Sequence, residues 1–140
     1  MSVTAKNKTL LIVALACLLL GVINYLLFQP NILAFHIAGF SSGNPLLIQN
    51  ETLRHLMTGY FSDIMWCSAL YLVTVVVSRL IFLQLFQKLL ILTLPFIVEA
   101  AQYFRIIGGT FDWYDILLYA AILLVFIICF PVLISVKYEK

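Results

Sequence analysis

The chain has 140 residues, of which 64% are hydrophobic and 10% are charged, and its formal net charge is +2. Soluble domains are about 45–50% apolar, so this composition predicts one membrane domain over residues 1–140, with no room for an appended soluble module. The small charge, without a Lys/Arg stripe, argues against a nucleic-acid partner.

Four continuous hydrophobic runs are long enough to span a membrane, at 9–28, 61–79, 86–105 and 113–136. A bilayer core of about 30 Å needs about 20 helical residues, and continuous runs favour helices over barrel strands. The expected fold is therefore all-α, a bundle of four transmembrane helices. Lys6 and Lys8 before the first run resemble a signal peptide, but the run is too long for a cleaved signal core.

Basic residues indicate the orientation of the bundle. Arg54 and Arg105 flank one set of helix ends, whereas the other set is flanked by Lys6, Lys8, Arg79, Lys88, Lys137 and Lys140. The positive-inside rule then predicts that both termini are cytoplasmic. Among the acids only Glu139 lies inside, and the outer side holds Glu51, Asp63, Asp112 and Asp115. The polar chemistry is expected to face outward.

The first outer loop, residues 29–60, is the longest connection. Within it, "NETLRHLMTGY" offers Asn50 as an N-cap, followed by apolar residues at helical spacing. Glu51 is expected to pair with Arg54 or His55. The segment predicts a short interfacial helix on the membrane surface or over the bundle, after a turn at "SSGNP", 41–45.

A cluster of polar residues surrounds the turn between the third and fourth runs. If the third helix ends near Arg105, Glu99 lies about 9 Å inside the membrane boundary. An ionised carboxylate at that depth costs at least a few kcal/mol unless it is paired, hydrated or protonated. Gln102 shares its helix face. We expect one outward-opening pocket, with Arg105 and Arg54 as available cations, lined by Glu99, Gln102, Asp112, Asp115 and Asp63 and flanked by Tyr119 and Trp66.

Simpler interpretations exist for several of these residues. Asp63 (or Ser62) and Asp112 (or Thr110) are also typical N-caps, and Arg105 is also placed to snorkel towards lipid phosphates. The aromatic residues at the same ends suit an interfacial belt: Tyr60, Trp66, Trp113 and Tyr114.

Neither a metal nor a cofactor is expected. His36 and His55 lack the spacing of metal ligands. The cysteines have no disulfide or zinc pattern and are interpreted as small packing residues: Cys17, Cys67 and Cys129.

The residues around the turn resemble the signature of VanZ-like membrane proteins. The matching positions are Glu99, Gln102, Gly108, Thr110, Phe111, Asp112 and Asp115. Three positions depart: Gly109 replaces the family's turn arginine, Tyr119 an asparagine and Ile122 a glycine. The resemblance implies a small polytopic protein of the bacterial inner membrane, in a family whose named member is linked to low-level teicoplanin resistance. It implies no biochemical activity.

Three functions are compatible with these residues, beside a role as a scaffold subunit of a larger envelope complex. The first is a non-enzymatic protein whose pocket binds a lipid headgroup, a lipid-linked cell-envelope precursor or an amphipathic antibiotic. Glu99 and Asp115 would accept hydrogen bonds from this ligand, Gln102 would orient it, and Trp66 and Trp113 would anchor it. The second is an enzyme acting on lipid-linked substrates, with Glu99 as general acid and Asp112 or Asp115 as base. The third is a proton-coupled transporter titrating at Glu99, for which four short spans would require a homo-oligomer.

Overall fold

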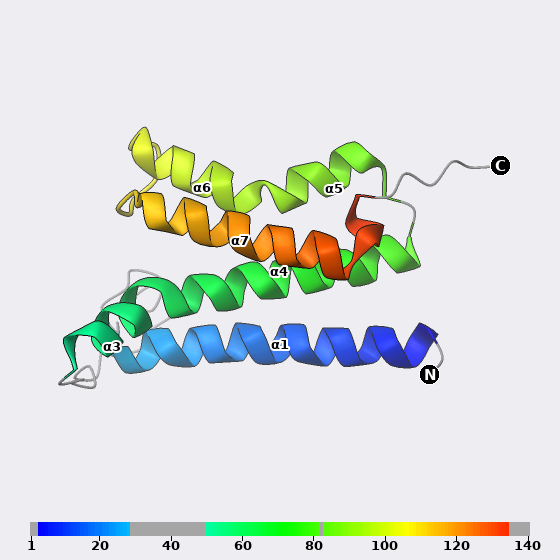
Figure 1. The fold of residues 1–140 in the computed structure, drawn as a ribbon, viewed down its shortest axis with the longest axis horizontal. Helices are drawn as coiled ribbons and strands as arrows, with labels where there is room; N and C mark the ends of the chain where they lie inside the picture. Colours follow the sequence, from blue (N-terminus) through cyan, green and yellow to red (C-terminus); the bar gives the residue numbers. More distant parts are fainter. Residues whose placement is uncertain (1–2, 29–49, 82, 135–140) are drawn as a thin grey trace.

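The computed structural model describes residues 3–28, 50–81 and 83–134, and every regular element in these ranges is helical. The predictions for His36, the turn at 41–45, Lys137, Glu139 and Lys140 lie outside the described residues. The elements, drawn in Figure 1, are α1 (Val3–Phe28), α3 (Glu51–His55), the π-helical turn η1 (Leu56–Tyr60), α4 (Phe61–Leu80), α5 (Leu85–Leu92), α6 (Leu94–Tyr103), α7 (Trp113–Cys129) and the 3-10 turn η2 (Pro131–Leu133).

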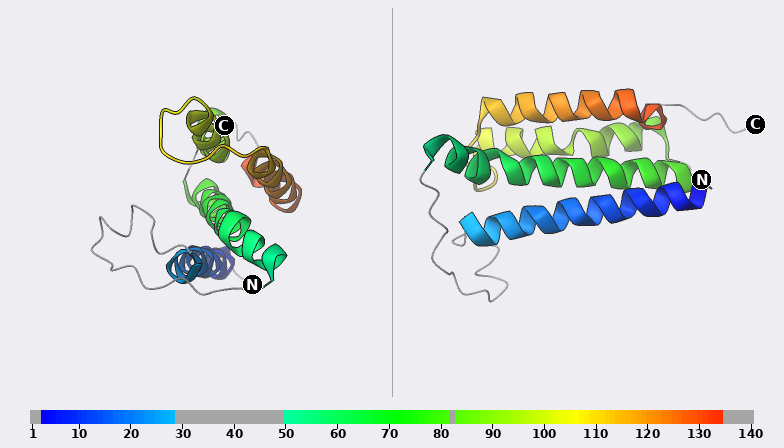
Figure 2. Two further views of the ribbon diagram at one scale, coloured as in Figure 1. Left: turned by 90° about the vertical axis from the view of Figure 1, so that its left-hand side faces the viewer. Right: turned by 60° about the horizontal axis from the view of Figure 1, so that its bottom comes forward.

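The long helices lie side by side and alternate in direction, as Figures 1 and 2 show. One end of the bundle gathers the end of α1, α3, the end of α6 and the start of α7; we call it the acidic end. The opposite, basic end gathers the start of α1, the end of α4, the start of α5 and η2. Lys6, Arg79 and Lys88 all belong to the basic end. The charge separation predicted from the sequence is therefore present among the described residues.

By length and composition, two helices can cross a membrane: Ala5–Phe28 and Glu51–Leu80. The pair α5 and α6 is a third candidate, because together the two helices are long and apolar enough for one span, which would be bent by 48°. Helix α7 is apolar but has only 17 residues, which is about 25 Å at 1.5 Å per residue. The structure thus supports a helical protein with two to three membrane-spanning candidates.

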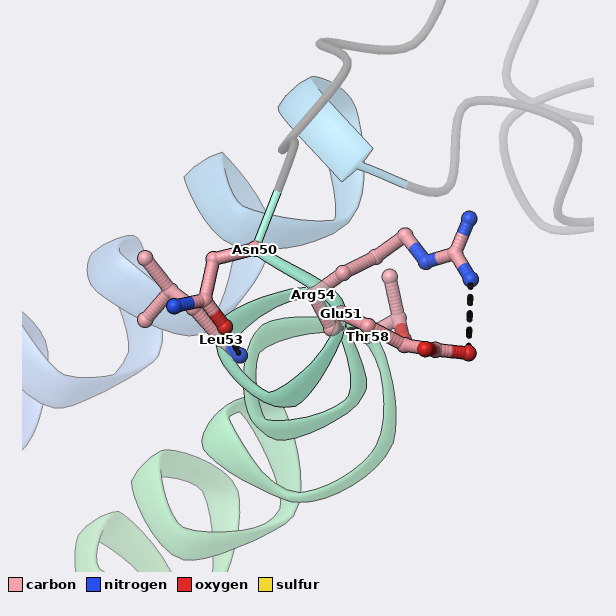
Figure 3. Close-up of polar contacts among 5 residues, drawn as sticks. All are labelled: Asn50, Glu51, Leu53, Arg54 and Thr58. Atoms are coloured by element: carbon pink, nitrogen blue, oxygen red, sulfur yellow. Dashed lines mark hydrogen bonds and ion pairs between the residues drawn. The ribbon is translucent and has the colours of Figure 1, made fainter.

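The helix predicted after Asn50 is present, and its start is capped as expected. Asn50 Oδ1 accepts a hydrogen bond from the backbone N–H of Leu53 at 3.1 Å, and Arg54 pairs with Glu51 at 3.8 Å (Figure 3). The helix does not stop at residue 60 but continues through η1 into α4 as one helix of 30 residues. Asp63 therefore lies inside a helix, and its interpretation as an N-cap is wrong. The position of α3 relative to a membrane surface stays a prediction.

Helix α1 packs along α4 through small and polar residues. Ala14, Gly21 and Ala69 are buried between the two helices. The buried side chain of Asn24 donates to the Met57 carbonyl at 2.7 Å and to Ser62 Oγ at 2.9 Å. Small residues and hydrogen-bonding side chains are the usual means of joining helices in a bilayer, where apolar burial drives little association.

A bend separates α5 from α6 inside the predicted third span. Pro95 has no backbone N–H to donate to the preceding turn, which bends or breaks a helix. Neighbouring side chains satisfy carbonyl groups near the bend: Thr93 Oγ1 donates to the Leu89 carbonyl at 2.8 Å, and Tyr71 of α4 donates to the Leu92 carbonyl at 3.0 Å. Beyond the bend, α6 packs mainly on α7, whereas α5 packs on α4.

The core lies where α4, α5, α7 and η2 meet. Its most buried side chains are Tyr71, Val75, Leu92 and Leu133, and the ring of Tyr71 packs edge-on against Phe126 at 5.4 Å. Cys67 belongs to the same core, which agrees with its interpretation as a packing residue, whereas Cys129 is exposed. The hydroxyl group of Tyr71 thus links the core to the bend through its hydrogen bond to the Leu92 carbonyl.

Replacing Tyr71 by phenylalanine should weaken the bundle. The change removes one buried hydrogen bond to the Leu92 carbonyl and keeps the ring, so we expect the free energy of unfolding to fall by about 1 kcal/mol. An SDS titration in mixed micelles measures this quantity. Tyr103→Phe, at an exposed tyrosine, is the control and should change it by less than about 0.5 kcal/mol. Equal effects of the two variants would contradict the role of Tyr71.

Candidate binding pocket

A pocket of about 650 Å³ opens at the acidic end of the bundle. We call it the acidic pocket. Its walls come from α1, the stretch from α3 to α4, α6, α7 and the turn between α6 and α7. Its polar lining side chains are Tyr25, His55, Thr58, Tyr60, Asp63, Glu99, Gln102, Thr110, Asp112, Asp115 and Tyr119. Segments far apart in the sequence therefore combine to form one polar site.

Glu99 lies at the inner wall of this pocket, one turn before the end of α6. Its side chain is only 4% exposed, although it belongs to a helix that is otherwise almost entirely apolar. The carboxyl group faces the backbone amide of Asp112. Its Oε2 atom is buried and has no hydrogen-bond partner within the described part of the chain. Glu99 is thus buried in the protein, with an acceptor left for a donor from outside.

The two aspartates of α7 have different local roles. Asp112 is the N-cap of α7, because its Oδ1 accepts a hydrogen bond from the backbone N–H of Tyr114 at 2.9 Å. The interpretation of Asp112 as an N-cap is therefore confirmed. Asp115, one turn further along, has a buried Oδ1 atom that receives no hydrogen bond from the described residues. Asp115 is thus the second carboxylate of the pocket lining with a buried oxygen atom that lacks a partner among the described residues.

The acidic pocket carries an excess of negative groups. Asp63, Glu99 and Asp115 lie close enough for their charges to repel one another, and Asp112 adds to the repulsion. No lysine or arginine is among the described residues that line the pocket. Arg54 is paired with Glu51 on the exposed surface. Buried like charges are costly unless protons, water or a cation compensate them, so the pocket favours cationic groups and hydrogen-bond donors.

The turn after α6 explains the placement of Arg105. The Ile106 N–H donates to the Ala101 carbonyl at 2.8 Å and the Arg105 N–H donates to the Gln102 carbonyl at 2.9 Å. This is a Schellman motif, with Arg105 in the left-handed conformation that glycine usually takes (φ 56°). The side chain of Arg105 is exposed and does not line the pocket. The left-handed backbone conformation of Arg105 ends α6.

The structure gives a reason for the glycine at position 109. Its φ of 137° is strained for other residues, and a Cβ atom here would lie 2.6 Å from Nε2 of Gln102. The amide of Gln102 therefore fills the space where a longer side chain at 109 would begin. This conformation of the turn requires glycine.

Most of the predicted site residues come together. Asp63, Glu99, Gln102, Asp112, Asp115 and Tyr119 line the acidic pocket, Trp66 lines a neighbouring apolar pocket, and Arg105 lines neither. Tyr25 of α1 was not predicted to contribute. Its only signal was the dipeptide Asn24–Tyr25, which places two polar groups near the end of an apolar run. The aromatic belt stays a prediction, with Trp113 and Tyr114 exposed at the start of α7.

No protein-family model, curated protein or solved structure matches the chain in comparisons of all three kinds. The description of the site therefore depends on its own residues and geometry.

Adding a methyl group at Gly109 should destabilise the turn. Gly109→Ala places Cβ against Gln102 in a left-handed backbone, and we expect the free energy of unfolding to fall by about 1–3 kcal/mol. Gly108→Ala is the matched control, because no atom lies within 4 Å of its added Cβ, and it should change stability by less than about 0.5 kcal/mol. Parallel SDS titrations compare the two variants, and an undisturbed Gly109→Ala would show that Gln102 does not pack as described.

Proposed function

We propose that this chain is an integral membrane protein that binds the polar group of a membrane-associated ligand in the acidic pocket. In this proposal α1, the helix from Glu51 to Leu80, the bent pair α5 and α6, and α7 form four spans. The basic end lies in the cytoplasm, with both termini, and the acidic end faces outward from a bacterial inner membrane. The charge separation between the two ends supports this orientation.

The proposal depends on two carboxyl groups that each have a buried oxygen atom without a hydrogen-bond partner among the described residues. Oε2 of Glu99 and Oδ1 of Asp115 are buried beside the acidic pocket without a hydrogen-bond partner in the described part of the chain. Buried acceptors without partners are rare in native proteins, since each costs about 1–3 kcal/mol. A ligand that donates hydrogen bonds to both groups would remove this cost, and the pocket is within the size range of ligand sites, about 300–1,000 Å³.

The ligand classes are those that combine donor groups with membrane attachment. A lipid headgroup, a lipid-linked cell-envelope precursor and an amphipathic antibiotic all present amines or hydroxyl groups at the outer surface of a membrane. Glu99 and Asp115 would accept hydrogen bonds from these groups. Gln102, whose amide is held against Gly109, would orient them.

Kinship with VanZ-like proteins is part of the proposal. It depends on the spacing of Glu99, Gln102, Asp112 and Asp115 and on their convergence in one pocket. A role in the cell envelope or in glycopeptide resistance follows only if that kinship holds.

Neutralising the buried acids should remove ligand binding without unfolding the protein. Glu99→Gln and Asp115→Asn keep the shape of the side chain and remove its charge, so each should weaken retention of the bound lipid or precursor about ten- to a hundredfold, the equivalent of one charge-assisted hydrogen bond. Native mass spectrometry of gently extracted protein measures which molecule stays bound. Glu51→Gln, which changes an exposed carboxylate outside the pocket, should retain it fully.

Unchanged retention in both Glu99→Gln and Asp115→Asn would refute the pocket as a binding site. Turnover of a lipid-linked substrate by the purified protein, abolished by Glu99→Gln, would instead assign the carboxylates to the enzymatic alternative. A proteoliposome flux that follows a proton gradient and depends on Glu99 would favour the transporter.

A further inference from the structure

A second pocket, of about 340 Å³, lies directly beside the acidic pocket. We call it the side groove. One wall is a single face of α4 that presents Trp66, Cys67 and Leu70. The opposite wall belongs to α6 and presents Leu94, Pro95 and Val98. The groove is therefore largely apolar, in contrast to the acidic pocket.

The side groove and the acidic pocket adjoin each other. Asp63, Val98 and Tyr119 line both of them. Asp63 and Tyr119 thus stand at the junction, with the carboxylates on one side and apolar side chains on the other. A ligand lying across this junction would need a polar part and an apolar part joined end to end.

The bend before Pro95 produces the side groove. Helix α5 packs on α4, but after the bend of 48° helix α6 packs mainly on α7. The faces of α4 and α6 consequently diverge towards the acidic end. Trp66 is held at the edge of the opening by α1, because its indole lies over Gly21, where a Cβ atom would come within 2.9 Å of Nε1.

The side groove opens on the outside of the bundle. Trp66 is 42% exposed and Leu94 is 46% exposed, and Val98 is also exposed. In a membrane this outer surface faces acyl chains. A chain already in the bilayer could therefore enter from the side without leaving an apolar environment.

We infer that the acidic pocket and the side groove together bind a phospholipid with a primary-amine headgroup, with its ammonium group among Asp63, Glu99 and Asp115 and one acyl chain between α4 and α6. The inference rests on the proposed function and names its ligand class. The amine follows from the carboxylates and from the absence of a lysine or arginine among the described lining residues. The acyl chain follows from the apolar walls and the shared junction.

The two parts of the site have different physical roles. An acyl chain that moves from the bilayer into the side groove exchanges one apolar environment for another, so this step contributes little to affinity. The ammonium group gains charge-assisted hydrogen bonds to buried carboxylates. The headgroup therefore selects the ligand, and the groove fixes the direction in which its chain leaves the pocket.

Photo-crosslinking in vesicles of phosphatidylcholine tests this inference with two matched probes. One is phosphatidylethanolamine and the other phosphatidylglycerol, each with a diazirine in one acyl chain. We expect phosphatidylethanolamine to label the segments 66–70 and 94–98 about tenfold more than phosphatidylglycerol does, the equivalent of one charge-assisted hydrogen bond. The exposed face of α7 around Leu124 should be labelled equally by both probes.

Two matched pairs of variants distinguish the contribution of the side groove to labelling from that of the acidic pocket. Leu94→Trp fills the groove and should reduce labelling of the segment 66–70 to the background on α7, whereas Leu124→Trp, at a leucine that is 59% exposed on α7, should leave it unchanged. Glu99→Gln should remove the preference for phosphatidylethanolamine, and Glu51→Gln should preserve it.

Each outcome has a distinct meaning. Even labelling of all exposed faces, or equal labelling by the two headgroups in the wild-type protein, would overturn the inference. If the lipid or precursor seen by native mass spectrometry is nevertheless lost in Glu99→Gln, the proposed function stands with another ligand. If its retention is unchanged in both Glu99→Gln and Asp115→Asn, both fail. A protein–protein crosslink through the segments 66–70 and 94–98 would assign the groove to a second copy of the chain and would also overturn the inference.

Discussion

The constraint on which the structure depends is that a carboxylate on an otherwise apolar helix must face the protein or water. Glu99 meets it because α6 directs this side chain towards α7 and away from the outer surface, where Ile97, Val98 and Ala100 are exposed. The turn that follows returns the chain so closely that the Asp112 backbone faces the Glu99 carboxyl group. The burial of one acid thus governs the arrangement of the turn, the start of α7 and the second acid, Asp115.

The two halves of the bundle are built differently. The interface between α1 and α4 uses small residues and a short hydrogen-bonded network from Asn24, which allows close and continuous packing. In the other half, the bend before Pro95 prevents α6 from following α4. Close packing in the first half gives a stable frame, and divergence in the second half leaves room for the acidic pocket and the side groove. Trp66 contacts both halves, since it lies over Gly21 and lines the groove.

Much of this arrangement follows from sequence patterns with direct physical meaning. Hydropathy locates the helical segments, and the offset of Gln102 from Glu99 places both on one helix face, because side-chain direction in a helix is fixed by spacing. The end of the α3 segment was not predictable in this way. Tyr60 and Phe61 keep helical dihedral angles through a π-turn, and no residue there distinguishes continuation from a stop. Asp63 consequently has a role that local capping rules do not foresee.

The contribution of α1 to the site was also beyond sequence reasoning. Tyr25 reaches the acidic pocket only because α1 lies beside α4 in a particular register, and that register depends on the contacts of Gly21 and Asn24 across the interface. Such pairings join residues about 40 positions apart, whereas capping, periodicity and turn rules act within a few residues. The side groove was missed for the same reason. Pro95 indicates a bend, but the direction of the bend depends on which neighbour α6 meets next.

The glycine at position 109 affects the charge balance of the site. An arginine at this position would add a permanent positive charge to the turn that lines the acidic pocket. Here the left-handed backbone strains any other residue and the amide of Gln102 would have to shift to admit a side chain, and Arg105 is committed to the end of α6 with its side chain exposed. The negative charge of the pocket therefore remains uncompensated by the described residues that line it. The acids can be ionised together only where water or a cation compensates their repulsion, and an amine of the ligand is one cation that can do so.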